Sequence, residues 1–259
     1  KTVALNEIST LAATEHSWPS VHVEVKPRMS FLAELVERLE AARHMLTQSP
    51  TPGRMQLTEA RVKAGAFGVG GEAGFTRASP TPSADVVESA LAAVMAAAME
   101  MASGIVLTVD EVHLGTREDL ATLTAALQRH VPDGWPIVVA VAGLPSLRDP
   151  RSSVTYLERG EWHELGLLGR DDTHEALTRP AEVAGRPMEP EAADTLATAT
   201  GGYPYAIQVF GHHAWRASAG SPTITVDHAR QADAAAQVDL SGGLFAGRWH
   251  DASPKEREY

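Results

Sequence analysis

The chain has 259 residues, of which 44% are hydrophobic and 21% are charged, as is typical of a folded globular protein. It carries 22 Lys and Arg against 33 Asp and Glu, and the resulting net charge of −11 argues against a surface that broadly attracts nucleic acid or anionic lipid. Cysteine is absent, which excludes disulfides, thiolate metal sites, iron–sulfur clusters and a cysteine nucleophile. No apolar run approaches the roughly 20 residues that span a bilayer, and no signal peptide opens the chain, so we expect a cytoplasmic protein without a membrane partner.

The first elements alternate between helix and strand. Apolar residues with helical spacing begin directly after Lys1-Thr2, and an alternating segment over 18–26 predicts a half-buried strand. Ser30 is in position to cap a second helix. Residues 47–84 are rich in Pro, Gly, Ser and Thr, and we expect a loop or hairpin insertion there.

The next elements continue this alternation. An Ala-rich helix over 85–102 precedes a nearly continuous apolar strand over 105–109, and Thr116 caps the helix that follows. A second apolar strand covers 137–142, and 162–168 is a candidate for a last short strand. Continuous apolar strands between helices predict an α/β fold with a parallel sheet that is covered on both faces.

The pattern changes to helices only from about residue 170. The predicted helices cover 171–184, 190–200, 204–217 and the residues from 227 onward. The predicted organisation is an α/β core over 1–168, a small all-helical domain over 169–232, and a linker with the start of a further domain over 233–259.

An acidic pair, Asp110-Glu111, follows the apolar strand over 105–109. The carboxyl end of a buried parallel strand is where such sheets bind ligands. Two adjacent carboxylates there require a positive partner, which Mg²⁺ bound to phosphate supplies. Asp110 would then hold the hydrated Mg²⁺ and Glu111 would polarise an attacking water. The alternative is that both residues only favour the N-terminus of the next helix electrostatically.

Lys1-Thr2 has the residue types that end a phosphate-binding loop and open directly into a helix. The first N–H groups of that helix have no preceding cap, and a capping-box signal at 253–256 stands three residues before the last residue. We therefore expect an excerpt of a longer polypeptide, with frayed ends as the alternative. The glycine loop and its strand would precede Lys1, leaving a gap in the sheet beside the strand over 105–109.

Four segments occur together in a recognisable order: Lys1-Thr2, Val109–His113, Ala140–Pro145 and Gly201–Tyr205. Because they contain these segments, residues 1–220 resemble a bacterial AAA+ ATPase of the branch near the origin-recognition and STAND signal-transduction ATPases. The resemblance implies a P-loop NTPase αβα sandwich followed by an all-helical lid, with Lys1 as the Walker A lysine and Asp110-Glu111 as Walker B.

The resemblance also implies residue roles. Lys1 would bind the β- and γ-phosphates and assist catalysis, and Thr2 would join Asp110 in holding Mg²⁺. Glu111 would be catalytic, while Gly202 and Pro204 of the lid would contact the nucleotide near the base.

Two features depart from the family pattern. The sensor position usually carries a polar side chain, but here it is Ala142-Gly143-Leu144, and the lid lacks the arginine of a second sensor. Arg148 or Arg151 is a candidate arginine finger, with a solvated loop arginine as the alternative.

The function expected is ATP binding with slow, Mg-dependent hydrolysis, used as a conformational switch. The alternative is a nucleotide-bound, non-catalytic or DNA-associated regulatory module that acts through a C-terminal winged-helix domain. A small-molecule kinase fits less well because of the separate helical lid. The expected partners are ATP or ADP and a second copy or another protein, with nucleic acid only through residues beyond this chain.

Overall fold

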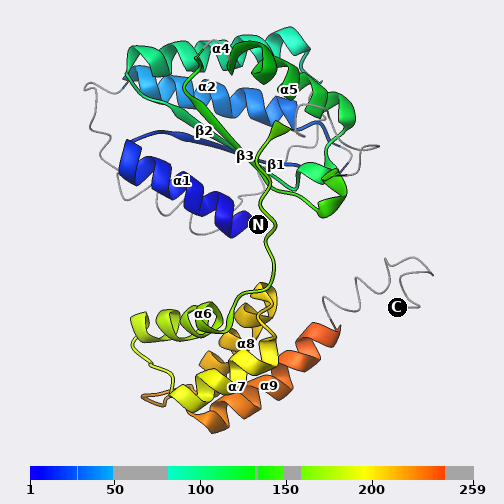
Figure 1. Cartoon of the computed structure of the whole chain (residues 1–259). Helices are drawn as coiled ribbons and strands as arrows, with labels where there is room; N and C mark the ends of the chain where they lie inside the picture. Colours follow the sequence, from blue (N-terminus) through cyan, green and yellow to red (C-terminus); the bar gives the residue numbers. More distant parts are fainter. Residues whose placement is uncertain (28, 49–80, 132–133, 149–158, 243–259) are drawn as a thin grey trace, which may run out of the picture. The chain divides into compact units, whose positions relative to one another are not determined.

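A computed structural model describes residues 1–27, 29–48, 81–131, 134–148 and 159–242 (Figure 1). The chain forms two compact units, Lys1–Trp162 and His163–Tyr259, and each is described by itself. The sequence placed this boundary at 168. Leu168 belongs with the second unit because its backbone N–H donates a hydrogen bond of 2.8 Å to the carbonyl oxygen of Gly202.

Some expectations fall outside the described residues. They include most of the predicted insertion over 47–84, the candidate arginine finger Arg151, and the capping-box signal over 253–256.

A parallel sheet of three strands organises the first unit in the described part of the chain. The strands are β1 (Ser20–Glu24), β2 (Ile105–Asp110) and β3 (Ile137–Val141), in the order β1-β2-β3. Both pairings are parallel, and Leu107 of the central strand stands opposite Val21 on one side and Val139 on the other. The predicted pairing of the two apolar strands is confirmed.

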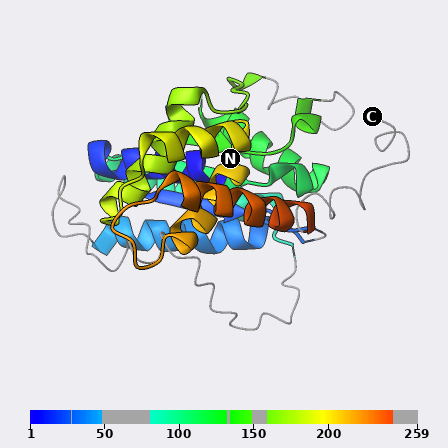
Figure 2. The same ribbon diagram turned by 90° about the horizontal axis from the view of Figure 1, so that it is seen from below.

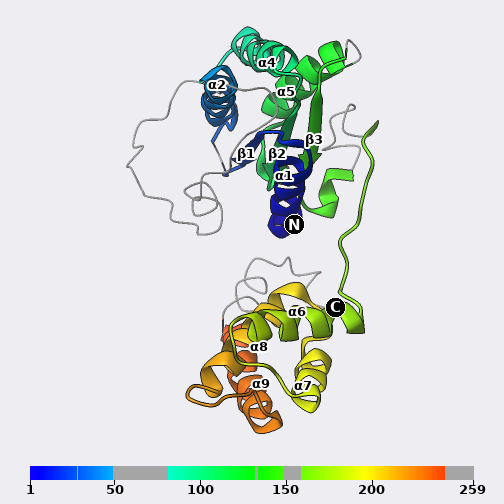
Figure 3. The ribbon, with the colours of Figure 1, turned by 90° about the vertical axis from the view of Figure 1, so that its left-hand side faces the viewer.

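Helices cover both faces of this sheet. Helix α1 (Thr2–His16) lies on one face, and α2 (Leu32–Gln48), α4 (Ala84–Glu100) and α5 (Arg117–His130) lie on the other (Figures 1 and 3). The predicted fold class, a parallel αβα sandwich followed by an all-helical unit, is confirmed.

The burial pattern explains why the strands differ in sequence. Every residue of β2 is buried, since the strand has a neighbour on each side and helices on each face. In β1 only Val21 and Val23 are fully buried, so the hydrophobic residues alternate with polar ones. Leu35 and Leu39 of α2 are buried in the core between the sheet and helices α2, α4 and α5.

Strand β3 forms one edge of the described sheet, and β1 forms the other. Within the described residues β3 pairs with β2 alone, and Val138 and Val141 are 46% and 37% exposed. The expected gap beside the strand over 105–109 is wrong, because β2 is paired on both sides. The candidate strand over 162–168 is also wrong: residues 161–169 form no regular element, and Leu165 and Leu167 are exposed.

The regular elements among the described residues of the second unit are helices, and one isolated bridge joins Met188 and Ile224. The helices are α6 (Arg170–Val183), α7 (Pro190–Thr200), α8 (Pro204–Ala217) and α9 (Val226–Leu240). Helices α8 and α9 pack against each other (Figure 2).

These bounds follow the predicted ones closely, with one difference at the C-terminal end. The predicted lid ended at 232, but α9 continues to Leu240 because Ala236 and Leu240 are buried in the same core as Phe210. None of the helices in the described part of the chain has the length and apolar character needed to cross a bilayer.

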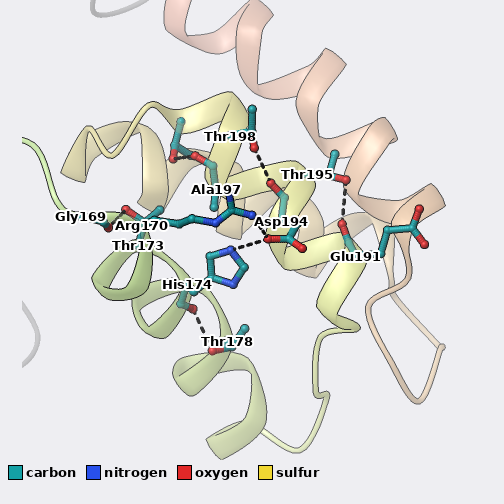
Figure 4. A network of polar contacts seen from close by, with 11 residues as sticks. Gly169, Arg170, Thr173, His174, Thr178, Glu191, Asp194, Thr195, Ala197 and Thr198 are labelled. Carbon is teal, nitrogen blue, oxygen red and sulfur yellow. Dashed lines mark hydrogen bonds and ion pairs between the residues drawn. The ribbon is translucent and has the colours of Figure 1, made fainter.

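A polar network joins α6 to α7 at the surface of this unit (Figure 4). One carboxylate oxygen of Asp194 accepts a hydrogen bond of 2.6 Å from Arg170 Nη2 and lies 3.0 Å from His174 Nε2. The hydrogen bond from Arg170 is the main cause that holds the pKa of Asp194 below its usual value of 3.8.

Candidate functional site

Helix α1 begins where β2 ends. The hydroxyl of Thr2, the first helical residue, donates a hydrogen bond of 2.5 Å to Oδ2 of Asp110. Lys1 is the N-cap of the helix, and its carbonyl oxygen accepts from the N–H of Leu5 at 3.1 Å. Lys1 adjoins Thr2 and Glu111 adjoins Asp110, with about 3.8 Å between consecutive Cα atoms. The hydrogen bond therefore brings all four residues close together. These are the four predicted site residues of the α/β core.

Asp110 is the buried member of the acidic pair, with 2% of its surface exposed. Oδ2 receives the Thr2 hydroxyl, and Oδ1 receives the backbone N–H of Glu111 at 2.8 Å. A buried carboxylate is tolerated when it is hydrogen-bonded in this way. Both oxygens are therefore oriented before any ligand arrives.

Glu111 differs from Asp110 in its surroundings and in its backbone. Its side chain is 35% exposed. Its φ is 51°, a left-handed conformation that is unfavourable for a residue with a side chain. Such strain persists only where the surrounding structure imposes it and is often found at functional sites. Here it turns the chain from β2 into the short helix η1 (Val112–Leu114).

The first turn of α1 contributes no negative charge of its own. It contains no acidic residue, and no side chain caps the helix. Helix N-termini carry a partial positive charge and unpaired N–H groups, which together favour an anion such as phosphate. The Lys1 side chain adds a full positive charge at the same end.

His113 also approaches the acidic pair. Its Nδ1 atom lies 3.4 Å from Oε2 of Glu111, within ion-pair distance. The contact does not have the geometry of a hydrogen bond, and among the described residues this buried nitrogen has no hydrogen-bond partner. Sequence reasoning assigned no role to His113, although it stands two residues after Glu111 in the segment that carries the family resemblance.

The end of β3 is tied to the same region through its backbone. Ala142 donates to the carbonyl of Val109 and accepts from the N–H of Val112, both at 2.9 Å. A side chain at Gly143 would collide with Leu147 and would come within 3.0 Å of Val112. The packing therefore disfavours any side chain at position 143.

The site offers few ligands for a metal ion. In the described ranges no group of three or more His, Cys, Asp or Glu side chains is close enough to hold one. Thr2 and Asp110 supply two neighbouring oxygens, which suits Mg²⁺, an ion that keeps several waters and takes phosphate oxygens as further ligands. The donor set therefore fits Mg²⁺ that arrives with a phosphate group.

Gly202 and Pro204 lie in the second unit, at the turn between α7 and α8. Gly202 has a φ of 74°, and a side chain there would collide with the carbonyl oxygen of Leu168. Pro204 is the first residue of α8, where its fixed φ favours the helix start. Gly202 and Pro204 therefore have structural roles in this turn that do not depend on a bound nucleotide. Arg148 ends the short helix η3 (Pro145–Arg148) in the first unit.

No protein-family model and no curated protein matches this sequence. Among solved structures, the chain is similar to Thermotoga maritima RuvB, a Holliday junction branch migration motor, at 17% identity and a TM-score of 0.43. The match covers 56% of each chain, so this chain spans just over half the length of RuvB.

Two further similarities cover more of the chain. The Aeropyrum pernix ORC2 protein, described in ADPNP–ADP complexes, matches at 15% identity and a TM-score of 0.46, over 91% of this chain and 67% of that one. C. elegans PCH-2 matches at 11% identity and a TM-score of 0.44, over 92% and 69% of the two chains. Similarities this distant assign no activity.

Proposed function

We propose that the protein is a P-loop ATPase of the AAA+ type, which binds ATP with Mg²⁺ and hydrolyses it slowly as a conformational switch. The observation that carries this proposal is the hydrogen bond between Thr2 and Asp110. It brings a Lys-Thr pair at a helix N-terminus to the acidic end of a buried parallel strand. Those are the parts that P-loop NTPases use to hold a nucleotide phosphate and its metal ion.

Binding would be the work of Lys1, Thr2 and Asp110. Lys1 and the N–H groups of α1 would contact the β- and γ-phosphates, while Thr2 and Asp110 would hold Mg²⁺. Bound Mg²⁺ neutralises charge on the phosphate oxygens. The resting contact between Thr2 and Asp110 keeps both oxygen ligands in place, so little reorganisation is needed when the ion enters.

Hydrolysis would depend on Glu111. Its carboxylate is partly exposed, whereas both oxygens of the buried Asp110 are engaged by hydrogen bonds. Two carboxylates in different surroundings serve different roles, and the freer one can accept a proton from an attacking water.

The helical unit would act as the lid of the switch. Gly202 and Pro204 would contact the nucleotide near the base, and the bound phosphates would favour a closed arrangement of lid and core that hydrolysis releases. This change in arrangement would alter self-association or the binding of a partner protein.

The proposal is tested with Glu111→Gln in the full chain. ATP affinity should be preserved, and the rate of hydrolysis should fall about 100-fold or more, because the proton acceptor is lost while the phosphate contacts remain. Glu118→Gln, an exposed glutamate in the first turn of α5, is the matched control and should hydrolyse ATP like the wild type. Equal rates for wild type and Glu111→Gln would remove Glu111 from the mechanism.

A second candidate is a nucleotide-bound module without hydrolysis. The observation in its favour is the end of β3, where Ala142, Gly143 and Leu144 offer no polar side chain to sense a γ-phosphate. ATP binding with no turnover in the wild type would support this candidate. The winged-helix domain and the contact with nucleic acid through it remain predictions about residues beyond this chain.

A further inference from the structure

We propose that His113 is a positioning residue for Glu111, donating a hydrogen bond from Nδ1 that aims the carboxylate at the attacking water. This inference rests on the proposed function, because it assigns Glu111 its role in hydrolysis. It adds a residue to which the family resemblance assigned no role.

The first observation is an unsatisfied ring nitrogen. Nδ1 of His113 is buried and has no hydrogen-bond partner in the described part of the chain, and the charged atom near it is Oε2 of Glu111 at 3.4 Å. Buried polar atoms are nearly always paired in folded proteins, so an orphan beside a carboxylate points to a contact that forms in another state. Hydrogen bonds at active sites often tighten only when the substrate is bound.

The second observation is that backbone contacts hold the turn that carries His113, while the side chain of Glu111 is partly exposed. Within the turn, the carbonyl of Glu111 accepts from Leu114 N–H at 2.8 Å, and the carbonyl of Val112 accepts from Gly115 N–H at 3.1 Å. The backbone nitrogen of His113 lies 3.3 Å from where a Cβ on Gly143 would stand, so the end of β3 presses against this turn.

The His113 side chain is correspondingly enclosed, at 15% exposed, whereas that of Glu111 is 35% exposed. A small rotation of Glu111 therefore suffices to bring its carboxylate to a fixed donor. Through the hydrogen bond between Ala142 and Val112, the end of β3 holds the element that carries this donor.

The chemistry requires one tautomer. A neutral imidazole with its proton on Nδ1 donates to the carboxylate and restricts the rotamers of Glu111, while Glu111 keeps its second oxygen for the water. No bond is made or broken at His113 itself. Its effect is on the orientation of the base, so it should change turnover more than nucleotide affinity.

Three substitutions separate this role from simple packing. An Asn side chain places its N–H₂ group near the position of Nδ1, whereas Gln places its N–H₂ group near Nε2 and Ala has none. We expect His113→Asn to keep most of the turnover and both His113→Gln and His113→Ala to lower kcat by about 10- to 100-fold with unchanged ATP affinity. Equal kcat in the Asn and Ala variants, or a loss of affinity in place of kcat, would overturn the proposal.

A second measurement does not depend on hydrolysis. The ¹⁵N chemical shifts of the imidazole report which nitrogen carries the proton, and we expect His113 to be protonated on Nδ1 with ATP bound and to lose this preference in Glu111→Ala. His22, whose Nδ1 lies 2.8 Å from Oγ1 of Thr108, is the internal control and should not change. A His113 tautomer that ignores Glu111 would refute the contact.

The two proposals fail in different ways. If Glu111→Gln hydrolyses ATP like the wild type, the proposed function of Glu111 is wrong whatever His113 does. If Glu111→Gln is slow but the His113 variants turn over normally, the positioning role alone is wrong.

Discussion

The hydroxyl of Thr2 and the carboxylate of Asp110 are joined by a hydrogen bond of 2.5 Å between residues 108 positions apart in the chain. Thr2 opens α1 on one face of the sheet, and Asp110 ends the central strand β2. This contact fixes the N-terminus of a helix beside the carboxyl end of the central parallel strand. It is the geometric basis of the predictions on nucleotide binding.

Removing the hydroxyl of Thr2 should weaken binding of Mg·ATP. We expect Thr2→Ala to raise the Kd about 10-fold or more, the size of one contact to a charged group, because one of the two protein oxygens that would hold Mg²⁺ is lost. Thr2→Ser keeps the hydroxyl and serves as the control. Titration of fluorescent ATP in the presence of Mg²⁺ measures the effect, and the same Kd for the Ala and Ser variants would contradict the prediction.

Replacing Asp110 should abolish the dependence of ATP binding on Mg²⁺. In the wild type we expect the affinity for ATP to be higher with Mg²⁺ than with a chelator. In Asp110→Ala the two affinities should converge, because one of the two protein oxygens that suit the ion is gone. Asp110→Asn, which keeps the shape, checks that the loss comes from charge and not from unfolding. Unchanged Mg²⁺ dependence in both variants would refute the metal assignment.

The turn between α7 and α8 makes a prediction about stability. Gly202→Ala should destabilise the helical unit, because it adds a collision with the Leu168 carbonyl to a left-handed backbone, φ 74°, that already costs about 1–2 kcal/mol for Ala. Gly201→Ala is the matched control: its φ is 56°, and a side chain there meets nothing within 4 Å. Urea unfolding compares the two, and an equal loss of stability would show that the collision is relieved at little cost.

Asp194 predicts a pH dependence at acid pH. The hydrogen bond from Arg170 is the first cause that lowers its pKa below 3.8, with further contributions from the charges of Arg170 and His174 opposing the effect of burial. A carboxyl group with a lowered folded pKa stabilises the fold above its unfolded value and loses that contribution as the pH falls through the folded value. The relevant window therefore lies below pH 3.8.

An NMR titration of the side-chain carboxyl measures this shift directly. In Arg170→Ala the pKa of Asp194 should rise toward 3.8, since the main cause of the shift is removed. Arg179→Ala is the control on the same helix, because Arg179 pairs with Glu175 at 3.1 Å instead. A pKa of Asp194 that does not respond to Arg170 would contradict this account of the network.

Local sequence signals were sufficient for most of the elements. Helices α7 and α8 begin at Pro190 and Pro204 and are separated at Gly201, as the sequence predicts. Thr116 accepts the N–H of Asp119 as the predicted cap of α5, at 3.1 Å. Caps, helix-starting prolines and left-handed glycines act within a few residues of their own position, so they can be read without the rest of the chain.

The strand pairing was also predictable in kind. A nearly continuous apolar run such as Ile105–Val109 indicates a strand that is covered on both faces, and this implies a central strand of a parallel sheet. The position of the open edge was not predictable. Strand β3 is as apolar as β2 in sequence, and only the pairing shows that β3 is the outer one in the described sheet.

The sequence by itself determined which residue types could form a nucleotide site, and the resemblance placed Lys1, Thr2, Asp110 and Glu111 in it. The tertiary structure decided that Thr2 reaches Asp110, that Glu111 is left-handed, and that His113 faces Glu111 without a hydrogen bond. These facts depend on how α1 packs against the sheet and on how the end of β3 presses against η1. Contacts between segments so far apart in the chain are set by the packing of whole elements, which local propensities do not encode.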